Sequence, residues 1–305
     1  MRISVVVPNY NGVALLERYL PSVVISLEGD CEVVVVDDAS TDGTVKALRE
    51  RFPDVEVIAR VSNEGFSAAV NDGIRASSGE FVVLLNNDVE VAPGLLDPIV
   101  CLFEEESVFA VSPKILVPSR GNLDEGAKTG FWHHGLFYTD QRQGIGRVTP
   151  ILYTSGCAAV YRRSMLESLG GFDEAYSPFY WEDADLGYRA WKRGWKSLYQ
   201  PARTVKHKHS ATIGKMDARS TDRIKARNGL FFIWRNIEDE ELMGRHRRWL
   251  PVVLARRALS RDWPFVRGYK DALAGKDEAQ AALERDSAHR KLSDREIFSR
   301  VGIRY

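Results

Sequence analysis

The chain has 305 residues, of which 42 are Lys or Arg and 42 are Asp or Glu, so its formal net charge is zero. This balance argues against nucleic acid as a partner, because proteins that bind nucleic acid usually carry a basic excess. The cysteines Cys31, Cys101 and Cys157 are odd in number and far apart, which is typical of reduced core residues and excludes a disulfide framework or a zinc finger.

The chain is long enough for one large α/β domain with an appendage. Apolar strand patterns at residues 3–7, 33–36, 55–59 and 81–85 alternate with helical patterns at 15–24, 45–52 and 66–76. Pro8 is expected to end the first strand, and Pro21 to kink or reset the first helix. This alternation predicts a mostly parallel, Rossmann-like sheet flanked by helices, with right-handed crossovers.

Past residue 93 the pattern becomes less regular. Helices are expected at 95–105, 164–169 and 182–193, and strands at 108–112 and 157–161. Residues 118–146 predict a loop with short strands, and 195–199 and 204–207 are typical of short edge strands. Everything after about residue 218 has a helical pattern. We therefore expect a main domain at 1–215, with halves at about 1–112 and 113–215, and a helical extension at 216–305.

Short polar side chains follow the apolar strand at 81–85. They are Asn86, Asn87 and Asp88. In open α/β sheets, ligands bind outside the carboxyl ends of the strands, where these residues would lie. Their oxygens could turn the chain, cap a helix or hold a hard cation such as Mg²⁺ or Mn²⁺. Taken alone, the stretch favours a turn.

The first two strand ends carry Tyr10 and Asp38. A dinucleotide-binding loop would need G-x-G-x-x-G after the first strand, where this chain has PNYNG. An aromatic face and a carboxylate suit a pyrimidine nucleotide instead, with Tyr10 stacked on the ring and Asp38 accepting from its edge. The alternative for Asp38 is turn formation or helix capping, which fits Asp42 and Thr44 better.

Three carboxylates, Glu182, Asp183 and Asp185, stand in the first turn of the helix expected at 182–193. The helix dipole stabilises acidic residues there, so one interpretation is purely structural. Residues 178–181 read PFYW and form an aromatic wall that would exclude water beside the acids. A carboxylate between such a wall and a helix amino terminus can serve as a general base.

His207 and His209 follow the expected strand at 204–207 and place two imidazoles on one side of an extended segment. Imidazole is both a common structural group and a common metal ligand. We leave open whether one of the two joins Asp88 at a cation or whether both are structural.

Seven stretches in the first 210 residues resemble the inverting family-2 glycosyltransferases of the GT-A fold, especially the bacterial rhamnosyltransferase-like branch that builds cell-surface polysaccharide. They occur in the family's order: VVVPNYNG, VVVVDDASTDGT, NEGFSAAVNDGI, GEFVVLLNNDV, SGCAAVYRRSMLESLGGFDE, FYWEDADLGYRAWKRGW and VKHKHSAT. The resemblance implies a GT-A catalytic domain at 1–215, whose first half binds the nucleotide sugar and whose second half carries the acceptor site and the base.

The resemblance also implies roles for single residues. Those near the donor nucleotide and sugar are Pro8, Tyr10, Asp38, Gly65, Asn71 and Asn87. Asp88 and His207 would hold a divalent cation, Mg²⁺ or Mn²⁺. Asp183 would be the catalytic base, and Trp181, Glu182 and Asp185 would position the acceptor or the helix. Residues 86–88 retain only the last carboxylate of the family's D-x-D pattern.

These roles predict an enzyme that moves a sugar, rhamnose by resemblance, from a UDP- or dTDP-sugar to a hydroxyl of a glycan or lipid-linked glycan. Transfer would be a single displacement with inversion. The alternative is a nucleotide-sugar-binding regulator or scaffold without turnover, and the presence of both Asp88 and Asp183 argues against it.

The helical extension interleaves arginines with Trp249 and neighbouring apolar residues. Such a helix is typical of an interfacial segment attracted to anionic lipid, or of a helix packed on the main domain or on a second subunit of a homodimer. The amino terminus lacks the zones of a signal peptide, and no apolar run approaches the roughly 20 residues that span a bilayer. We expect a cytoplasmic protein, peripheral on the cytoplasmic face of the inner membrane if the lipid interpretation holds.

Overall fold

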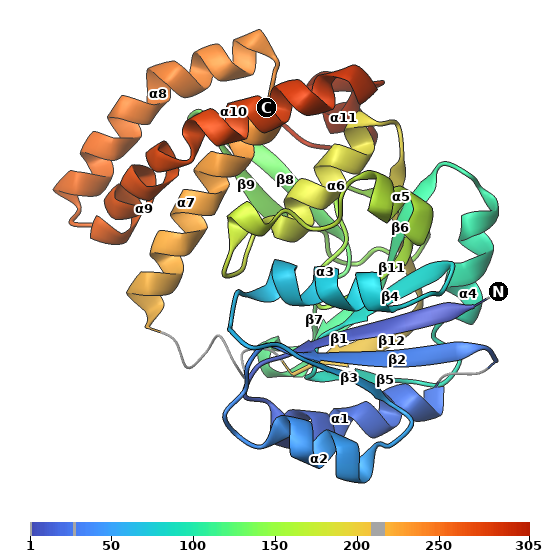
Figure 1. The fold of residues 1–305 in the computed structure, drawn as a ribbon. Coiled ribbons are helices and arrows are strands. Elements are labelled where there is room, and N and C mark those ends of the chain that lie inside the picture. The colour runs from blue at the N-terminus through green and yellow to red at the C-terminus, as the bar shows by residue number, and fades with distance from the viewer. Residues whose placement is uncertain (1, 27–28, 209–216) are drawn as a thin grey trace.

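Four short segments rich in valine build the parallel side of the sheet. In the computed structural model, which describes residues 2–26, 29–208 and 217–305, they are β1 (Ile3–Asn9), β2 (Cys31–Asp37), β3 (Glu56–Ala59) and β4 (Phe81–Leu85). They are parallel and lie in the order β4-β1-β2-β3. Helices α1 (Val13–Ser26) and α2 (Thr44–Arg51) cover one face and α3 (Phe66–Ala76) the other (Figure 1). The predicted parallel sheet with helices on both faces is confirmed.

Two prolines in this half interrupt the structure less than their type suggests. β1 continues through Pro8 to Asn9 in register with β2, so the prediction that Pro8 ends the strand is wrong. Proline lacks only the N–H group, and its carbonyl can still accept a hydrogen bond. Pro21 lies inside α1 without ending it, because Leu20 and Val23 on either side of it are buried and hold the helix on the core.

The second half adds strands on the other side of β4. β11 (Ala158–Arg162) is antiparallel to β4 and to β6 (Val108–Val117). β12 (Lys196–His207) is parallel to β6, and β10 (Thr149–Ile151) is the edge strand beyond it. β5 (Val89–Val91) and β7 (Leu123–Asp124) pair with β12 and β6. β8 (Lys128–His133) and β9 (Leu136–Gln141) form a separate hairpin within the stretch expected to be loop and short strands.

Two sequence predictions in this half need correction. Residues 195–199 and 204–207 are not two edge strands but parts of β12, a strand of 12 residues inside the sheet. The register with β6 shifts between Gln200 and Thr204, where Pro201 cannot donate a ladder hydrogen bond. The helix expected at 95–105 is the short α4 (Asp97–Val100) followed by a 3₁₀ turn (Cys101–Glu104). The expected helices α5 (Arg163–Ser168) and α6 (Glu182–Lys192) are present.

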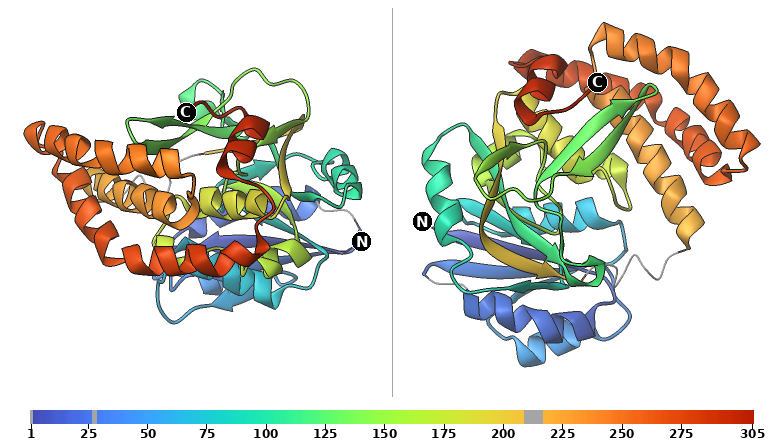
Figure 2. Two further views of the ribbon diagram at one scale, coloured as in Figure 1. Left: turned by 90° about the horizontal axis from the view of Figure 1, so that it is seen from above. Right: turned by 180° about the vertical axis from the view of Figure 1, so that it is seen from behind.

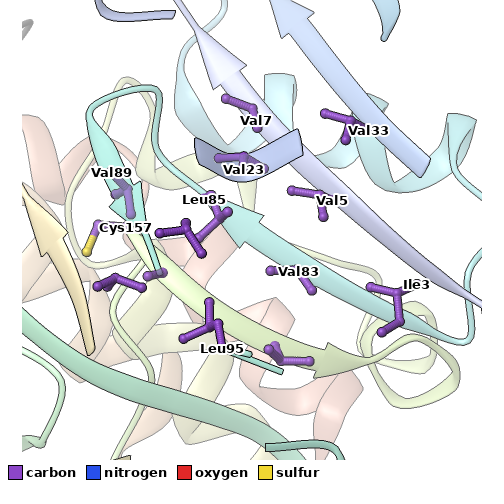
Figure 3. Close-up of a cluster of buried hydrophobic side chains, with 14 of the residues drawn as sticks. Ile3, Val5, Val7, Val23, Val33, Val83, Leu85, Val89, Leu95 and Cys157 are labelled. Carbon is purple, nitrogen blue, oxygen red and sulfur yellow. The ribbon is translucent and has the colours of Figure 1, made fainter. Parts of the chain in front are cut away.

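Apolar side chains on one face of β1 and β4 pack against α1 in a single cluster. Figure 3 shows Val5, Val7, Val83 and Leu85 of β1 and β4 gathered with Val23 of α1 in one cluster. Each of these side chains is at most 3% exposed. Full burial of a Val or Leu side chain contributes roughly 1.5–3 kcal/mol, so this cluster fixes the position of the strand ends that carry the polar residues.

The carboxyl-terminal part is helical, as predicted. It contains α7 (Ala218–Asn236), α8 (Glu240–Leu259), α9 (Trp263–Ala274), α10 (Lys276–Asp286) and α11 (Asp294–Val301). Phe232 of α7 and Phe298 of α11 share a hydrophobic cluster with Phe137 of β9 and Trp191 of α6. The extension therefore packs into the core of the second half (Figure 2). The domain boundary near residue 215 stays a prediction.

Within the three described ranges, none of the helices combines the length and the apolar composition that crossing a membrane would require.

Candidate active site

Side-chain amides connect the carboxyl ends of three neighbouring strands. Nδ2 of Asn9, at the end of β1, donates to Oδ1 of Asp37 on β2 at 2.9 Å. Nδ2 of Asn87, after β4, donates to Oδ1 of Asn9 at 2.6 Å. The side chain of Asn11 accepts from the backbone N–H of Thr41 at 2.8 Å. These bonds hold the loops after β1, β2 and β4 together at one edge of the sheet.

Tyr10 and Asp38 lie at this edge in different environments. Tyr10 is 37% exposed, so a face of its ring is accessible. Asp38 is buried, and its carboxylate accepts from Arg60 at 2.7 Å and from the backbone N–H groups of Glu64 and Gly65 at 3.2 and 3.0 Å. The carboxylate thus already binds the 64–65 loop, and its contact with a base stays a prediction.

Gly65 is where the first half touches the loop before α6. It has a φ of 96°, and a Cβ placed on it would lie 2.7 Å from Oγ of Ser177 and 2.8 Å from the carbonyl oxygen of Pro178. The approach is closed by hydrogen bonds, because Ser177 donates to the carbonyl of Glu64 at 2.7 Å and the N–H of Phe66 donates to the carbonyl of Pro178 at 3.0 Å. Only glycine fits this backbone contact without strain.

Asn71 connects the same two parts of the chain. It is buried on α3, where its amide donates to the carbonyl of Phe172 and accepts from the N–H of that residue, both at 2.9 Å. Its amide also donates to Glu174 at 3.0 Å. This geometry assigns Asn71 to the packing of α3 against the turn at 172–174, and donor contact by Asn71 stays a prediction.

A cavity of about 790 Å³ lies between the two halves and the carboxyl-terminal helices. Of the residues singled out in the sequence, it is lined by Asn86, Asn87, Asp88, Trp181, Glu182, Asp183 and His207. Outside its lining are Pro8, Tyr10, Asp38, Gly65, Asn71 and Asp185. The candidate metal ligands and the candidate general base therefore share one cavity. The residues expected to bind the nucleotide ring lie at the sheet edge beside it.

Asp88 and His207 are brought together by strand pairing. β5 follows Asp88 directly and runs antiparallel to the end of β12, in the register that places Val89 opposite His207. Oδ1 of Asp88 lies 3.3 Å from Nε2 of His207, and Nδ1 of His207 lies 3.6 Å from Oε2 of Glu125. Burial favours the neutral imidazole, but the neighbouring Cys157, Asp88 and Glu125 outweigh it and raise the pKa of His207. His209 lies outside the described residues.

The pair fits a divalent cation as a partial site. Asp88 offers a carboxylate oxygen and His207, once a cation displaces its proton, an imidazole nitrogen on one wall of the cavity. No cluster of three or more His, Cys, Asp or Glu side chains suited to a metal occurs in the described ranges, so phosphate or water oxygens would supply the remaining ligands. A carboxylate suits Mg²⁺ or Mn²⁺, and an imidazole beside it favours Mn²⁺ over Mg²⁺.

Asp183 stands at the start of α6 behind two residues in a strained backbone conformation. Tyr180 and Trp181 have φ angles of 73° and 78°, a region that costs roughly 1–3 kcal/mol per non-glycine residue and is common at functional sites. Oδ1 of Asp183 accepts from the N–H of Ala184 at 2.8 Å, and Oδ2 from the N–H of Gly156 at 3.2 Å. Burial raises the pKa of Asp183, while the positive charge of Lys128 and these hydrogen bonds oppose the rise.

Glu182 differs from its neighbour. It is 6% exposed, it lines the cavity, and its Oε2 has no hydrogen-bond partner among the described residues. Burial and the adjacent Asp183 raise the pKa of Glu182 well above its ordinary value. The pKa values of the two carboxyl groups therefore differ, and Glu182 is the group that favours the protonated form.

Asp185 does not line the cavity. It is fully buried and accepts from Tyr176 at 3.1 Å, from Arg189 at 2.6 Å and from Asn236 of α7 at 2.8 Å. Burial alone would raise the pKa of Asp185, but the charges of Arg189 and Arg235 hold it below its ordinary value. The resemblance allowed Asp185 to position either the acceptor or the helix, and this geometry fits the second role.

Several cavity residues were not found from the sequence. Lys128 comes from the hairpin β8–β9, Gly156 from the loop before β11, and Arg257, Asp262 and Phe265 from the junction of α8 and α9. Gly156 lies within the stretch SGCAAVYRRSMLESLGGFDE, which carried part of the family resemblance. The local sequences of the other four carry no motif, so the only signal for them is the fold.

Trp181 lies at its expected place in the cavity wall, where its ring packs on α7. A Cβ placed on Gly229 of that helix would lie 2.9 Å from the indole ring. The ring of Trp181 also lies 5.2 Å from that of Phe232, measured between their centroids. The carboxyl-terminal extension therefore supports the aromatic wall beside Asp183.

Known proteins share this sequence and architecture. The model of glycosyl transferase family 2 matches residues 4–170. The chain is 31% identical over 243 residues to the N-acetylglucosaminyl-diphospho-decaprenol L-rhamnosyltransferase of Mycobacterium tuberculosis, covering 70% of this chain and 78% of that protein. It is 30% identical over 222 residues to the pre-mycofactocin glycosyltransferase of the same species, covering 71% of this chain and 45% of that protein.

Solved structures share the fold at lower identity. The structure of GalNAc-T7 with UDP, GalNAc and Mn²⁺ has a TM-score of 0.68 at 19% identity, covering 99% of this chain and 56% of that one. Staphylococcus aureus TarS 1–349 in complex with UDP-GlcNAc has a TM-score of 0.60 at 16% identity, covering 95% and 88%.

The parallel first half, the mixed second half and the cavity between them define an α/β protein of the GT-A class. The chain belongs to glycosyl transferase family 2. The resemblance drawn from the sequence motifs is thereby confirmed at the level of the family and of rhamnosyltransferase homologues.

Proposed function

We propose that the protein is an inverting hexosyltransferase that moves a sugar, rhamnose by similarity, from a UDP- or dTDP-sugar to a hydroxyl of a lipid-linked glycan in cell-surface polysaccharide synthesis. The observation that carries the proposal is that Asp88, His207 and Asp183 line one cavity of about 790 Å³. Small-molecule sites typically measure roughly 300–1,000 Å³, so the size of this cavity supports a site for a small-molecule donor.

The relatives support the choice of substrates. The similar mycobacterial protein is named for the transfer of L-rhamnose to N-acetylglucosaminyl-diphospho-decaprenol. In an acceptor of that kind a sugar with free hydroxyl groups is attached to a lipid diphosphate. Tyr10 and Asp38, at the sheet edge beside the cavity, would hold the pyrimidine base of the donor, with Asn87 reaching from the sheet edge into the cavity.

Asp88 and His207 would hold Mg²⁺ or Mn²⁺ at the diphosphate of the donor. When bound there, the cation would supply Lewis-acid neutralisation of the negative charge that develops on the leaving group. The close approach of the carboxylate and the imidazole, 3.3 Å between Oδ1 and Nε2, supports a shared ligand between them.

Asp183 would accept the proton of the attacking hydroxyl. Burial raises the pKa of its carboxyl group and so strengthens it as a base, while the positive charge of Lys128 opposes that rise. The N–H groups of Gly156 and Ala184 fix its orientation. The acceptor oxygen would attack the anomeric carbon from the face opposite the diphosphate, which is one displacement with inversion. Glu182, when protonated, would donate a hydrogen bond to a sugar oxygen.

The experiment that tests this proposal measures nucleoside diphosphate release from a panel of UDP- and dTDP-sugars. It uses Mn²⁺ or Mg²⁺ and a short-chain lipid diphosphate that carries N-acetylglucosamine as acceptor. We expect release that depends on the acceptor, and a product with inverted anomeric configuration by NMR. Retained configuration would contradict the role of Asp183. Donor binding without release for any pair would favour the nucleotide-sugar-binding regulator.

A further inference from the structure

Residues 244–270, which cover most of α8 and of α9, form a basic segment in a chain whose net charge is zero. The segment has one acidic residue, Asp262, whose Oδ2 lies 2.8 Å from Nη1 of Arg257. Its basic residues are Arg245, Arg247, Arg248, Arg256, Arg257, Arg261, Arg267 and Lys270. The segment is therefore a local positive region that the rest of its own sequence does not balance.

Basic and apolar side chains alternate on one exposed stripe of α8. Arg248, Val252, Arg256 and Leu259 follow one another at spacings of about one helical turn, so they lie on the same face. Val252 is 45% exposed and Leu259 is 85% exposed, and Trp249, beside the stripe, is 36% exposed. Apolar side chains presented to water among arginines are typical of a helix that lies at a membrane surface.

The stripe continues around the corner between the two helices. Arg261 lies in this corner and is exposed, and Trp263, the first residue of α9, is 51% exposed. Figures 1 and 2 show α8 and α9 meeting at a corner that projects away from the sheet. The outer face of this hairpin, defined by Arg248, Trp249, Val252, Arg256, Leu259, Arg261 and Trp263, is thus presented at the periphery of the molecule.

The inner side of the same hairpin belongs to the active-site cavity. Arg257, Asp262 and Phe265 line that cavity together with Asp183. Arg257 also lies over the ring of Phe265, 5.0 Å from its centroid. Neighbouring residues on the hairpin therefore contact the cavity on one side and carry the exposed stripe on the other.

We propose that the outer face of the α8–α9 hairpin docks on an anionic lipid bilayer. Lipid phosphates would pair with Arg248, Arg256 and Arg261, and Leu259 and Trp263 would enter the interfacial layer. A second copy of this chain is the poorer partner, because a twofold contact through this face would bring the same arginines against each other. Docking here brings the cavity to the bilayer, where a lipid-linked acceptor lies. That last consequence rests on the proposed function, and the docking does not.

The test is vesicle flotation of the full chain with phosphatidylcholine vesicles, with and without phosphatidylglycerol. We expect binding only to the anionic vesicles and a loss of that binding at high salt. The triple variant R248Q/R256Q/R261Q should bind roughly 100-fold more weakly, since each basic residue near an anionic surface contributes about a fivefold factor. The double variant L259Q/W263Q should weaken binding while keeping the salt dependence.

The matched control is R18Q/K46Q/R49Q, which removes the same charge from exposed positions on α1 and α2. It should bind like the parent protein, and thermal unfolding of all variants checks that they are folded. Equal binding to neutral vesicles, no binding to either vesicle, or equal weakening in the control would overturn the proposal. Light scattering that shows a dimer dissociated by the hairpin variants would assign the face to a second copy. Nucleoside diphosphate release with a soluble acceptor reports on the proposed function separately.

Discussion

Oδ1 of Asp88 and Nε2 of His207 approach to 3.3 Å, although the two residues belong to different halves of the sheet. The contact follows from backbone pairing, because β5 runs antiparallel to the end of β12 and the N–H of Lys208 donates to the carbonyl of Asp88 at 3.0 Å. Strand pairing holds side chains more rigidly than a loop does. The candidate cation site is therefore fixed before any ligand arrives.

We expect Asp88→Asn to weaken donor binding in Mn²⁺ roughly tenfold or more and to remove the difference between Mn²⁺ and EDTA. The substitution keeps the size of the side chain and removes the charge that a divalent cation needs. Calorimetric titration of the nucleotide sugar, with and without metal, measures both effects. Glu90→Gln, at an exposed residue outside the cavity, is the control and should bind like the parent. Unchanged affinity of Asp88→Asn in both conditions would remove Asp88 from the site.

Asp183→Asn should retain donor affinity and lose sugar transfer by about 10²–10⁴-fold, the usual contribution of a general base. The amide preserves the shape of the side chain but cannot take the proton of the acceptor hydroxyl. The comparison is with Asp222→Asn, an exposed acidic residue that also lines the cavity and that we expect to affect turnover little. Turnover of Asp183→Asn close to that of the parent would exclude the base role.

The sequence predicted the first half of the fold well because its strands and helices are local patterns. Four apolar runs alternate with amphipathic helices, and the carboxyl end of each strand is marked by short polar residues. Asp88, Glu182 and Asp183 could be proposed for the same reason, since each follows a strong apolar or aromatic segment. All three line one cavity.

What the sequence could not predict depends on contacts between distant segments. β12 continues through Pro201 because it pairs with β6 on both sides of that proline, up to Gln200 and again from Thr204. Asn71 and Asp185 resemble ligand-binding residues by type and position, but Phe172 and Asn236, far along the chain, occupy their polar groups. Lys128, whose charge lowers the pKa of Asp183, lies on a hairpin whose sequence has no recognisable strand pattern.

Glu182→Gln should remove part of the pH dependence of stability. Burial and Asp183 raise the pKa of Glu182 in the folded protein, so folding binds a proton that the unfolded chain has already lost. Its favourable contribution is complete below the unfolded pKa of about 4.3 and is lost as pH rises toward the folded pKa, by about 1.4 kcal/mol per pH unit. Glutamine stays neutral, so the variant should gain stability relative to the parent as pH rises.

Urea unfolding of both proteins across pH 5–8 measures this difference, and the midpoint and slope together give the free energy of unfolding. Asp185→Asn is a useful contrast, because the pKa of Asp185 is lowered by Arg189 and Arg235. Its stabilising charge is present above the ordinary pKa of aspartate and is lost at lower pH. Parallel stability curves for the parent and Glu182→Gln would mean that Glu182 is ionised in the folded state.

Gly65→Ala should disturb the active site by displacing the loop at 177–181, which precedes Asp183. A Cβ at Gly65 would lie 2.7 Å from Oγ of Ser177 and 2.9 Å from Cα of Pro178, so the loop that leads into Asp183 must move. Gly43→Ala is the control for a positive φ without a steric contact, because Gly43 has a φ of 83° and no atom within 4 Å of its Cβ position, although its ψ of 11° differs from the 179° of Gly65.

The control should lose about 1–2 kcal/mol of stability from backbone strain alone and keep its transfer activity per folded molecule. Gly65→Ala should lose more stability than that, and its transfer rate should fall because the base is displaced by the moving loop. Chemical unfolding gives the first comparison, and the rate constant at saturating donor and acceptor gives the second. If both variants lost stability equally and kept full activity, the contact of the 64–65 loop with Ser177 and Pro178 would have no part in positioning Asp183.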